Sequence, residues 1–209
     1  IDMKITYAIT VCRELEEIKK LIPFLLKNKR QQDEIVTVFD QTNGDEKVAE
    51  FLTKYNKLPN VQFFRVYFEN DFSKHKNALI GFCDGDYIFQ IDADEFPNEK
   101  FIKDLPEIIE MNPDNEVYLV PRVNTVEGLT QDHIIKWRWN INEKGWVNFP
   151  DYQWRIFKKS NKIRYKNRVH EVLDGYNSFS QLPADEDYCL YHHKQIDKQE
   201  KQNKYYETL

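Results

Sequence analysis

The stretch of sequence that decides the fold is Gly-Asp-Tyr-Ile-Phe-Gln-Ile-Asp-Ala-Asp-Glu, residues 85–95. Its segment 86–91 (DYIFQI) is rich in β-forming residues and predicts a strand buried in a sheet. Asp92 and Asp94 follow this strand at once. Two carboxylates at a strand end are poorly placed for packing but well placed for a hard divalent cation that carries a diphosphate.

Three strand-and-helix units precede this stretch. Strands are predicted at residues 4–11, 34–40 and 61–68, and helices at 14–27, 45–55 and 73–82. Strands that alternate with helices predict an α/β fold, a mostly parallel sheet flanked by helices. Ligands bind such sheets at the carboxyl ends of the strands. Asp40 ends the second strand, so we expect it at the same edge as Asp92 and Asp94.

The second half of the chain does not continue the regular alternation of strands and helices. Its predicted elements are a helix at 98–111, a strand at 116–126, a hairpin made of 152–158 and 163–166, a strand at 188–192 and a polar helix at 196–209. Pro121 restricts the strand at 116–126 to a sheet edge or a bulge. We therefore expect one domain with two halves, residues 3–95 and residues 96–209.

Composition narrows the class of protein. The 209 residues are 41% hydrophobic and 14% aromatic, which rules out a disordered chain despite 31% charged residues. No apolar run reaches about 18 residues, so no membrane-spanning segment is predicted. The three cysteines are far apart, which argues against a disulfide scaffold or a zinc ribbon. A cytoplasmic protein fits this pattern, with attachment to a membrane surface left open.

Charge and aromatic residues are concentrated in one segment. Residues 136–170 hold ten Lys and Arg but two acidic residues, a balance of +8 within a chain of net charge −5. The chain as a whole is therefore not a nucleic-acid binder by charge, although this segment could meet an anionic ligand or be a solvated strand pair. Four tryptophans lie close together in or near it, Trp137, Trp139, Trp146 and Trp154. They predict either a platform for a sugar ring or a small aromatic core.

Two other classes of protein compete with an enzyme that uses Asp92 and Asp94 to hold a cation and its diphosphate. A nucleotidyltransferase would need a Gly-rich loop after the first strand to cradle a triphosphate, but Cys12 to Leu15 contain no glycine. A non-catalytic carbohydrate-binding protein of the same fold is the alternative. Asp92 and Asp94 argue against it, because binding alone does not require them.

Several motifs together resemble glycosyltransferase family 2. They are FSKHKNAL at 72–79, GDYI at 85–88 and IDADE at 91–95. The segments WRIF at 154–157 and RVHE at 168–171 are similar to a bacterial and viral branch of that family. Ile9 to Glu14, Asp40 and YHH at 191–193 add further matches. The resemblance extends from residue 4 to about residue 195, although Arg13-Glu14 replaces the usual Asn-Glu and the usual Glu-Asp pair is missing.

This resemblance implies a GT-A fold and the transfer of a sugar, with inversion, from a nucleoside diphosphate sugar. It implies that residues 3–95 bind the nucleotide sugar and that residues 96–209 bind the acceptor. A UDP-sugar is the first expectation for the donor, and a glycan, a glycolipid or a protein-linked glycan for the acceptor. It also implies a divalent cation, Mn²⁺ or Mg²⁺, between the diphosphate and the protein. This is chemically reasonable, since a leaving diphosphate needs a Lewis acid and an acceptor hydroxyl needs a general base.

The resemblance also implies roles for individual residues. The metal ligands expected from it are Asp92, Asp94, His192 and His193. The donor contacts expected from it are Asp40, Lys76, Asn77, Asp92 and Ala93. For the general base we expect Glu171, which follows the basic segment, with Asp151 as the second candidate.

Overall fold

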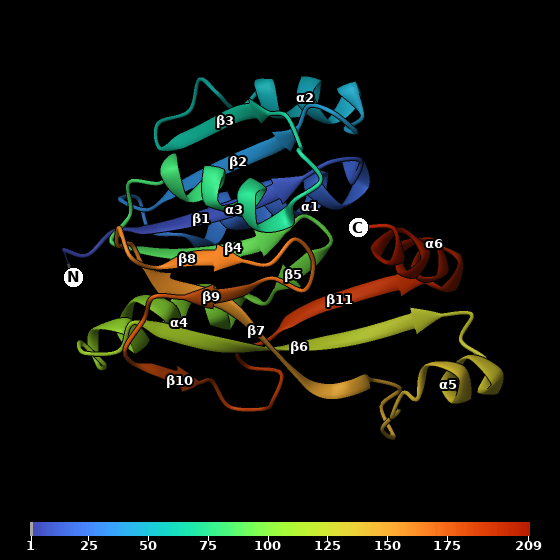
Figure 1. Ribbon diagram of the computed structural model, residues 1–209. Helices are drawn as coiled ribbons and strands as arrows, with labels where there is room; N and C mark the ends of the chain where they lie inside the picture. Colours follow the sequence, from blue (N-terminus) through green and yellow to red (C-terminus); the bar gives the residue numbers. More distant parts are fainter. Residues whose placement is uncertain (1) are drawn as a thin grey trace.

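One mixed sheet forms the centre of the molecule in the computed structural model, which describes residues 2–209 (Figure 1). Within that range the strand order is β3-β2-β1-β4-β7-β6-β11-β5, and β10 pairs with β6 beside this path. A separate two-stranded sheet, β8 with β9, lies in front of the central one in Figure 1. The α/β fold predicted from the sequence is confirmed.

The first half supplies the parallel part of the sheet. Its elements are β1 (Ile5–Val11), α1 (Leu15–Asn28), β2 (Glu34–Asp40), α2 (Glu46–Thr53), β3 (Val61–Val66), α3 (Phe72–Gly81) and β4 (Tyr87–Asp92). The pairs β1–β2, β1–β4 and β2–β3 are all parallel. Their carboxyl ends therefore meet at one edge, where Asp40 and Asp92 are the last residues of β2 and β4.

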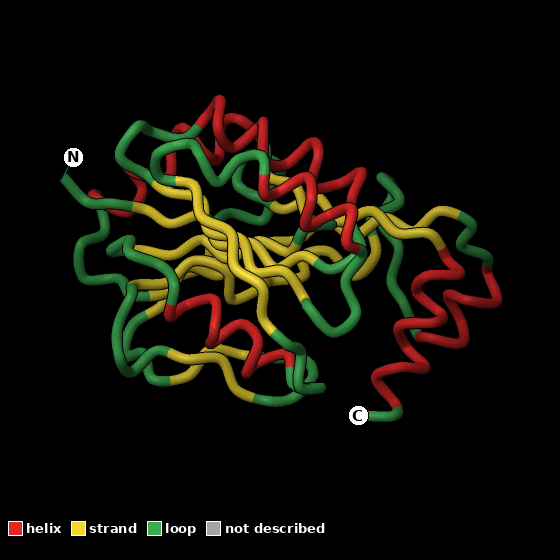
Figure 2. Tube along the Cα trace, turned by 90° about the horizontal axis from the view of Figure 1, so that it is seen from above, coloured by secondary structure: helices red, strands yellow, loops and turns green. Residues whose placement is uncertain are grey.

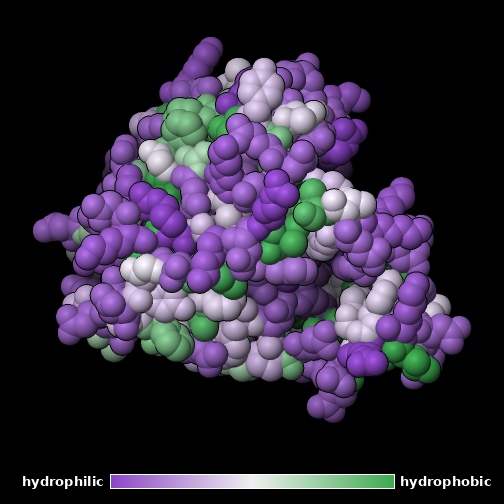
Figure 3. Space-filling view, in the orientation of Figure 1, coloured by the Kyte–Doolittle hydropathy of each residue, from purple (hydrophilic) through white to green (hydrophobic). Residues whose placement is uncertain are grey.

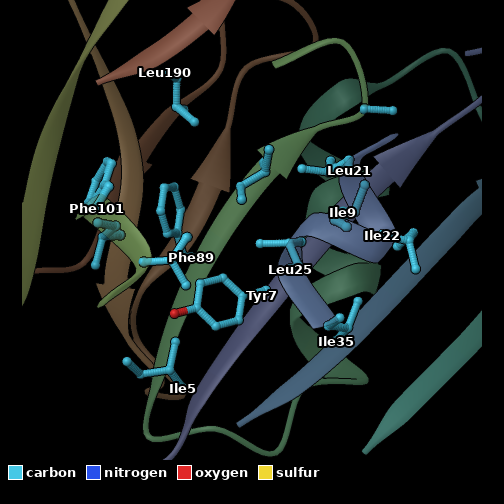
Figure 4. Close-up of a cluster of buried hydrophobic side chains, with 14 of the residues drawn as sticks. Ile5, Tyr7, Ile9, Leu21, Ile22, Leu25, Ile35, Phe89, Phe101 and Leu190 are labelled. Atoms are coloured by element: carbon cyan, nitrogen blue, oxygen red, sulfur yellow. The ribbon is translucent and has the colours of Figure 1, made fainter. Parts of the chain in front are cut away.

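Alternation along β1 divides the core between the two faces of the sheet. Ile5, Tyr7 and Ile9 belong to the larger cluster, which packs against α1, α2 and α4. Figure 4 shows these residues with Leu21 of α1 and with Phe89 of β4. Ala8 points to the other face, where the smaller cluster includes residues of α3, β8 and β9. Successive strand residues point to opposite faces, so strands buried on both faces read as continuous apolar runs.

The second half extends the same sheet. Its elements are β5 (Glu95–Pro97), α4 (Glu99–Glu110), β6 (Val117–Glu127), α5 (Gln131–Trp137), β7 (Val147–Lys158), β8 (Arg164–Lys166), β9 (Val172–Asp174), β10 (Phe179–Gln181), β11 (Leu190–Gln195) and α6 (Ile196–Glu207). Strand β7 is antiparallel to both β4 and β6, so it joins the two halves into one sheet. No helix in the described part of the chain is long and apolar enough to cross a membrane.

One sequence prediction in this half is wrong, and another is confirmed in one of its two alternatives. The hairpin of 152–158 with 163–166 is wrong, because β7 pairs with β4 and β6 while β8 pairs with β9. The strand at 116–126 is not an edge strand, since β6 lies between β7 and β11. The predicted bulge is present: the register of β6 against β7 shifts between Arg122 and Asn124, next to Pro121.

Helices α5 and α6 stand apart from the layers around the sheet, and Figure 2 shows α6 to one side of it, ending at the C-terminus. They contact each other through His133 and Glu200, whose Nε2 and Oε1 atoms are 3.1 Å apart. Neither helix contains a buried residue. Helix α6 is attached through polar contacts such as that of Glu200 with His133 and through the ring of Tyr206, which packs on Phe72 and His170.

Candidate active site

A cleft of ≈ 600 Å³ lies where the ends of β4, β6, β7 and β11 meet α6. Figure 3 shows this face of the molecule hollowed beside the lobe that carries α5 and α6, with mostly hydrophilic surface around the hollow. The walls include Asp92, Asp94, Glu171 and His192. These residues are separated by up to 100 positions in the sequence, so only the fold of the sheet brings them together.

Asp92 is held firmly by its neighbours. Its Oδ1 accepts hydrogen bonds from Thr10 Oγ1 (2.9 Å) and Gln90 Nε2 (3.1 Å), and its Oδ2 accepts one from Arg155 Nη2 (3.1 Å). Burial raises the pKa of Asp92, but the positive charges of Lys76 and Arg155 outweigh burial and hold it well below its usual range. Asp92 therefore stays ionised, with both oxygens engaged by protein donors.

Asp94 and His192 face each other across the cleft wall, with Asp94 Oδ2 3.2 Å from His192 Nε2. The other ring nitrogen, Nδ1, is 2.8 Å from Asn124 Oδ1. Asn124 Nδ2 donates to Asp151 Oδ2 (2.8 Å), and because a carboxylate only accepts, this bond fixes the orientation of the Asn124 amide. His192 Nδ1 must then carry a hydrogen, which leaves Nε2 pointing at the Asp94 carboxylate.

This geometry is suited to a cation. A lone pair on His192 Nε2 would repel Asp94 Oδ2, so a proton or a metal ion has to lie between the two atoms. Burial raises the pKa of Asp94, and the hydrogen bond and charge of His192 outweigh it, so that the pKa lies below its usual value. Imidazole and carboxylate together suit Mn²⁺, and a bound hydrogen-bond acceptor on the far ring nitrogen is the usual support of a metal-binding histidine.

The protein alone does not complete such a site. Within residues 2–209, no group of three or more His, Cys, Asp or Glu side chains is arranged to hold a metal ion. A divalent cation at Asp94 and His192 would therefore need ligands from water or from a substrate phosphate. Mg²⁺ in particular is commonly bound in this way, through one or two carboxylates and substrate oxygens.

Two arginines connect the carboxylates beneath the cleft. Arg155 donates to Glu95 Oε1 (3.1 Å) and Oε2 (3.0 Å) as well as to Asp92. Arg122 donates to Glu95 Oε2 (3.0 Å) and to Asp151 Oδ2 (2.9 Å). Together with Asn124, His192 and Asp94 these residues form a continuous polar network, in which Glu95 is almost fully buried. The network fixes the orientation of the two cleft aspartates.

Glu95→Ala is expected to reduce the free energy of unfolding by about 3–5 kcal/mol, because it removes the buried carboxylate that the buried Arg155 and the half-buried Arg122 share. Urea unfolding followed by circular dichroism measures this change. The control is Glu107→Ala on the exposed side of α4, which should change stability by less than about 0.5 kcal/mol. Equal effects of the two substitutions would show that the network does not stabilise the fold.

Glu171 lies in the cleft beside Lys76. Its Oε1 is 2.6 Å from Lys76 Nζ, and the same ammonium group is 3.8 Å from Asp92 Oδ1. Lys76 is buried and also lies over the ring of Tyr165. Burial raises the pKa of Glu171, but the charge and hydrogen bond of Lys76 outweigh it and leave the pKa below its usual 4.5. Glu171 is thus an ionised carboxylate that lines the cleft.

Asp151, the second candidate base, is more restrained. It lines the same cleft, but it accepts hydrogen bonds from Arg122, from Asn124 and from Gln153 Nε2 (2.8 Å). These three donors occupy the lone pairs that a base would use for a proton. Its clearest task is to orient Asn124, and through Asn124 the ring of His192.

Asp40 does not line the cleft. Its Oδ1 accepts from the backbone N–H groups of Thr42 and Asn43, both at 2.9 Å, and its Oδ2 from Asn43 Nδ2 at 3.1 Å. The carboxylate therefore closes the turn that follows β2. Its predicted contact with the nucleoside stays a prediction, and the turn contacts are its role in this structure.

Four other predicted residues do not line the cleft, and one of them, Lys76, reaches it only through its ion pair with Glu171. Asn77 uses its amide to hold the backbone of Tyr165, with bonds of 2.9 and 2.8 Å, and so ties α3 to β8. Ala93 is buried, and its N–H donates to the carbonyl of Thr10 (3.0 Å). His193 points away from His192 because neighbouring strand residues alternate, and its Nδ1 lies 2.7 Å from Thr125 Oγ1.

The basic and aromatic segment is divided by the fold. Arg155 is its buried member, whereas most of its other cations are exposed, as the solvated alternative predicted. The four tryptophans do not form one cluster: Trp137 stacks near Trp139, Trp146 packs on Phe149, and Trp154 donates to Tyr176. Trp139 and Trp154 line the cleft, so these two remain candidates for contact with a sugar ring.

Sequence reasoning missed several residues of the cleft. Arg122, Asn124 and Lys194 line it together with polar residues of α6. The period-two alternation of strands was the available signal, since Lys194 shares a strand face with His192 and Asn124 shares one with Arg122. What the sequence did not show was that β11 lies beside β6, which brings these two strand faces together.

The chain matches one protein-family model and resembles several solved structures. The family model described as Glycosyl transferase family 2 matches residues 6–186. A solved structure of S. aureus TarS residues 1–349 with UDP-GlcNAc is 18% identical with a TM-score of 0.66, covering 92% of this chain and 59% of that one. The structure of the same TarS fragment with UDP is 17% identical with a TM-score of 0.64, covering 91% of this chain and 60% of that one.

At this level of identity the likeness to TarS shows the fold alone. A third structure of TarS 1–349 has 17% identity and a TM-score of 0.63, covering 91% of this chain and 60% of that one. The chain thus spans about three fifths of the length of these TarS structures. No curated protein sequence matches it.

Proposed function

Because the chain belongs to glycosyltransferase family 2, we propose that it transfers a sugar from a nucleoside diphosphate sugar to a hydroxyl group, with inversion at the anomeric carbon. A UDP-sugar is the first candidate donor, since TarS has been solved with UDP-GlcNAc and with UDP. The acceptor is a glycan, a glycolipid or a protein-linked glycan. The observation that carries the proposal is the cleft in which the Asp94–His192 pair and Glu171 occur together.

Asp94 and His192 would hold a divalent cation, Mn²⁺ or Mg²⁺. When bound, such a cation neutralises charge on the diphosphate. Asn124 keeps His192 in the tautomer that presents Nε2, and Asp151 keeps Asn124 in place. Asp92 contributes negative charge to the site, but Arg155 and its other donors occupy its oxygens. We therefore propose Asp94, with His192, as the main ligand and Asp92 as its supporting neighbour.

Glu171 is proposed as the general base. The acceptor hydroxyl loses its proton to the Glu171 carboxylate while its oxygen forms a bond to the anomeric carbon of the donor. The bond from that carbon to the diphosphate oxygen breaks in the same displacement, and its electron pair leaves with the diphosphate. One displacement inverts the anomeric configuration, so a single carboxylate suffices.

A screen for nucleoside diphosphate release tests the proposed function. Donors with UDP, GDP and dTDP are incubated with the protein, Mn²⁺ and a panel of simple glycan acceptors, and free nucleotide is measured. Release that depends on protein and on acceptor supports transfer. Binding of sugars without any release, across donors that bind, would favour the alternative of a non-catalytic carbohydrate-binding protein.

Lys76→Met is expected to move the acidic limb of the pH profile to higher pH. In the unmodified protein Lys76 holds the pKa of Glu171 below 4.5. Glu171 is therefore still ionised at pH 4.5, and kcat/KM should fall only at a lower pH. Without Lys76, burial and the nearby charge of Asp92 should raise this pKa, opposed only by the weaker effect of a backbone hydrogen bond. The limb should then lie above pH 4.5.

The measurement is kcat/KM as a function of pH, which reports the free enzyme. Lys74→Met is the matched control, because Lys74 lies on the same helix but is exposed and pairs with Glu69. An unchanged limb in Lys76→Met would mean that Glu171 does not set it.

A further inference from the structure

Lys194 is a cleft residue that forms no salt bridge within residues 2–209, although the charges of Asp94 and Asp92 act on it from a greater distance. It lies on β11 two positions after His192, so the two side chains share one face of the strand. Among the lysines and arginines that line the cleft in the described part of the chain, Arg122 and Arg155 have carboxylate partners. The ammonium group of Lys194 instead donates to a neutral group, the amide oxygen of Gln202 on α6.

This arrangement concentrates positive charge beside the Asp94–His192 pair. Alternate residues of a strand are about 7 Å apart, and the side chain of a lysine spans a similar distance. A ligand anion that reaches Asp94 and His192 through a cation would therefore also lie within reach of Lys194. An amide is a weak partner for a half-buried ammonium group, whereas a phosphate oxygen forms a charge-assisted bond with it.

We propose that Lys194 binds the diphosphate of the donor at the phosphate next to the sugar and stabilises the charge that develops there during transfer. This inference rests on the proposed function. As the bond between the anomeric carbon and the phosphate oxygen breaks, its electron pair remains on that oxygen. The ammonium group of Lys194 hydrogen-bonds the oxygen and keeps its own proton, while the acceptor proton goes to Glu171.

Gln202 has a defined part in this inference. Together with Gln199, Asn203 and Tyr206 it forms the polar side of α6 that faces the cleft. The amide holds Lys194 in place when no phosphate is bound, and Gln202 Nε2 in turn donates to Tyr206 Oη at 2.7 Å. Because the Lys194–Gln202 bond involves a neutral acceptor, a phosphate can replace it at little cost in free energy.

Calorimetric binding of nucleotides tests the role of Lys194. The probes are UDP, GDP and dTDP with Mn²⁺, and the diphosphate that binds most tightly is compared with its own monophosphate. Lys194→Met should weaken binding of the diphosphate by roughly 10- to 100-fold, the range expected for a hydrogen bond between charged groups, and change binding of the monophosphate less than about twofold. Lys201→Met replaces an exposed lysine of α6 and is the control; it should leave both affinities unchanged.

Gln202→Glu provides a second test that keeps the lysine and the shape of the side chain. It gives Lys194 a carboxylate partner that competes with the phosphate. Binding of the diphosphate should therefore again be weakened, and binding of the monophosphate should change little. If the unmodified protein binds the diphosphate and both variants bind it equally well, the role of Lys194 is disproved while the proposed function stands. If the unmodified protein binds none of the three diphosphates, both proposals fail.

Discussion

Sugar transfer is expected to fall by on the order of 10³-fold or more in kcat/KM when Asp94 is replaced by Asn, since the cation that neutralises the leaving diphosphate loses its carboxylate ligand. The substitution keeps the size of the side chain and removes its charge. Asp94 lines the cleft and its side chain is 21% exposed, so the fold should tolerate the amide. The measurement is the rate of nucleoside diphosphate release at saturating Mn²⁺, with thermal melting as the test of folding.

Asp187→Asn is the matched control for this variant. Asp187 belongs to another Asp-x-Asp pair, but that pair lies in an exposed loop near Glu186, outside the main cleft. Its substitution should leave transfer unchanged. Activity of the unmodified protein that survives EDTA at full rate would contradict the role given to Asp94, as would an Asp94→Asn variant that transfers sugar normally.

Glu171→Gln is expected to lower kcat by about 10²- to 10⁴-fold, the range usual for removal of a general base. The amide cannot accept the proton of the acceptor hydroxyl. Binding of the nucleoside diphosphate should change little, because Glu171 contacts neither Asp94 nor His192 in this structure. Single-turnover transfer and calorimetric binding of the diphosphate separate the two effects.

Asp151→Asn distinguishes the two candidate carboxylates. If Asp151 only orients Asn124, the variant should raise the Mn²⁺ concentration needed for half-maximal rate by about 10- to 100-fold, as for other supporting residues of metal sites, with kcat at saturating Mn²⁺ nearly unchanged. If Asp151→Asn instead loses kcat while Glu171→Gln transfers normally, the two roles are exchanged. If neither variant is slow, the base lies outside the segment that contains them.

The parallel half of the fold was predictable because its signals are local. Each strand of that half is a short β-rich run followed by an amphipathic helix, and the predicted bounds at 34–40 match β2. The placement of Asp92 and Asp94 at the carboxyl edge follows from the same pattern. No distant contact was needed for any of these predictions.

The second half depends on pairings that its sequence does not encode locally. Strand β7 inserts between β4 and β6, and the short segment 163–166 pairs with β9 instead of with β7. Two apolar runs that are close together in the sequence predict a hairpin, even where each strand pairs with a different partner in the folded protein. The ion network of residues 95, 122 and 155 likewise has no local signal in the sequence, because the ion-pair partners are at least 27 positions apart.

The site residues divide along the same line. Asp94, His192 and Glu171 were predicted and do line one cleft. Asn77 and His193 were predicted from their neighbours in the resemblance, but their side chains hold the backbone of Tyr165 and contact Thr125. Strand alternation alone decides that His192 faces the cleft and His193 does not, and the register of β11 was not known from the sequence.

The position of β11 has a consequence for how the molecule acquires its structure during synthesis. This strand lies between β6 and β5, yet it is the last strand in the described chain, and the contact of His192 with Asp94 spans 98 positions. Until β11 emerges from the ribosome, β5 and the β11-facing edge of β6 lack their partner, and such late, non-local pairing is slow. The cleft therefore forms only after β11 has joined the sheet, and a nascent chain that has folded its parallel half still exposes a sheet edge that is prone to aggregation.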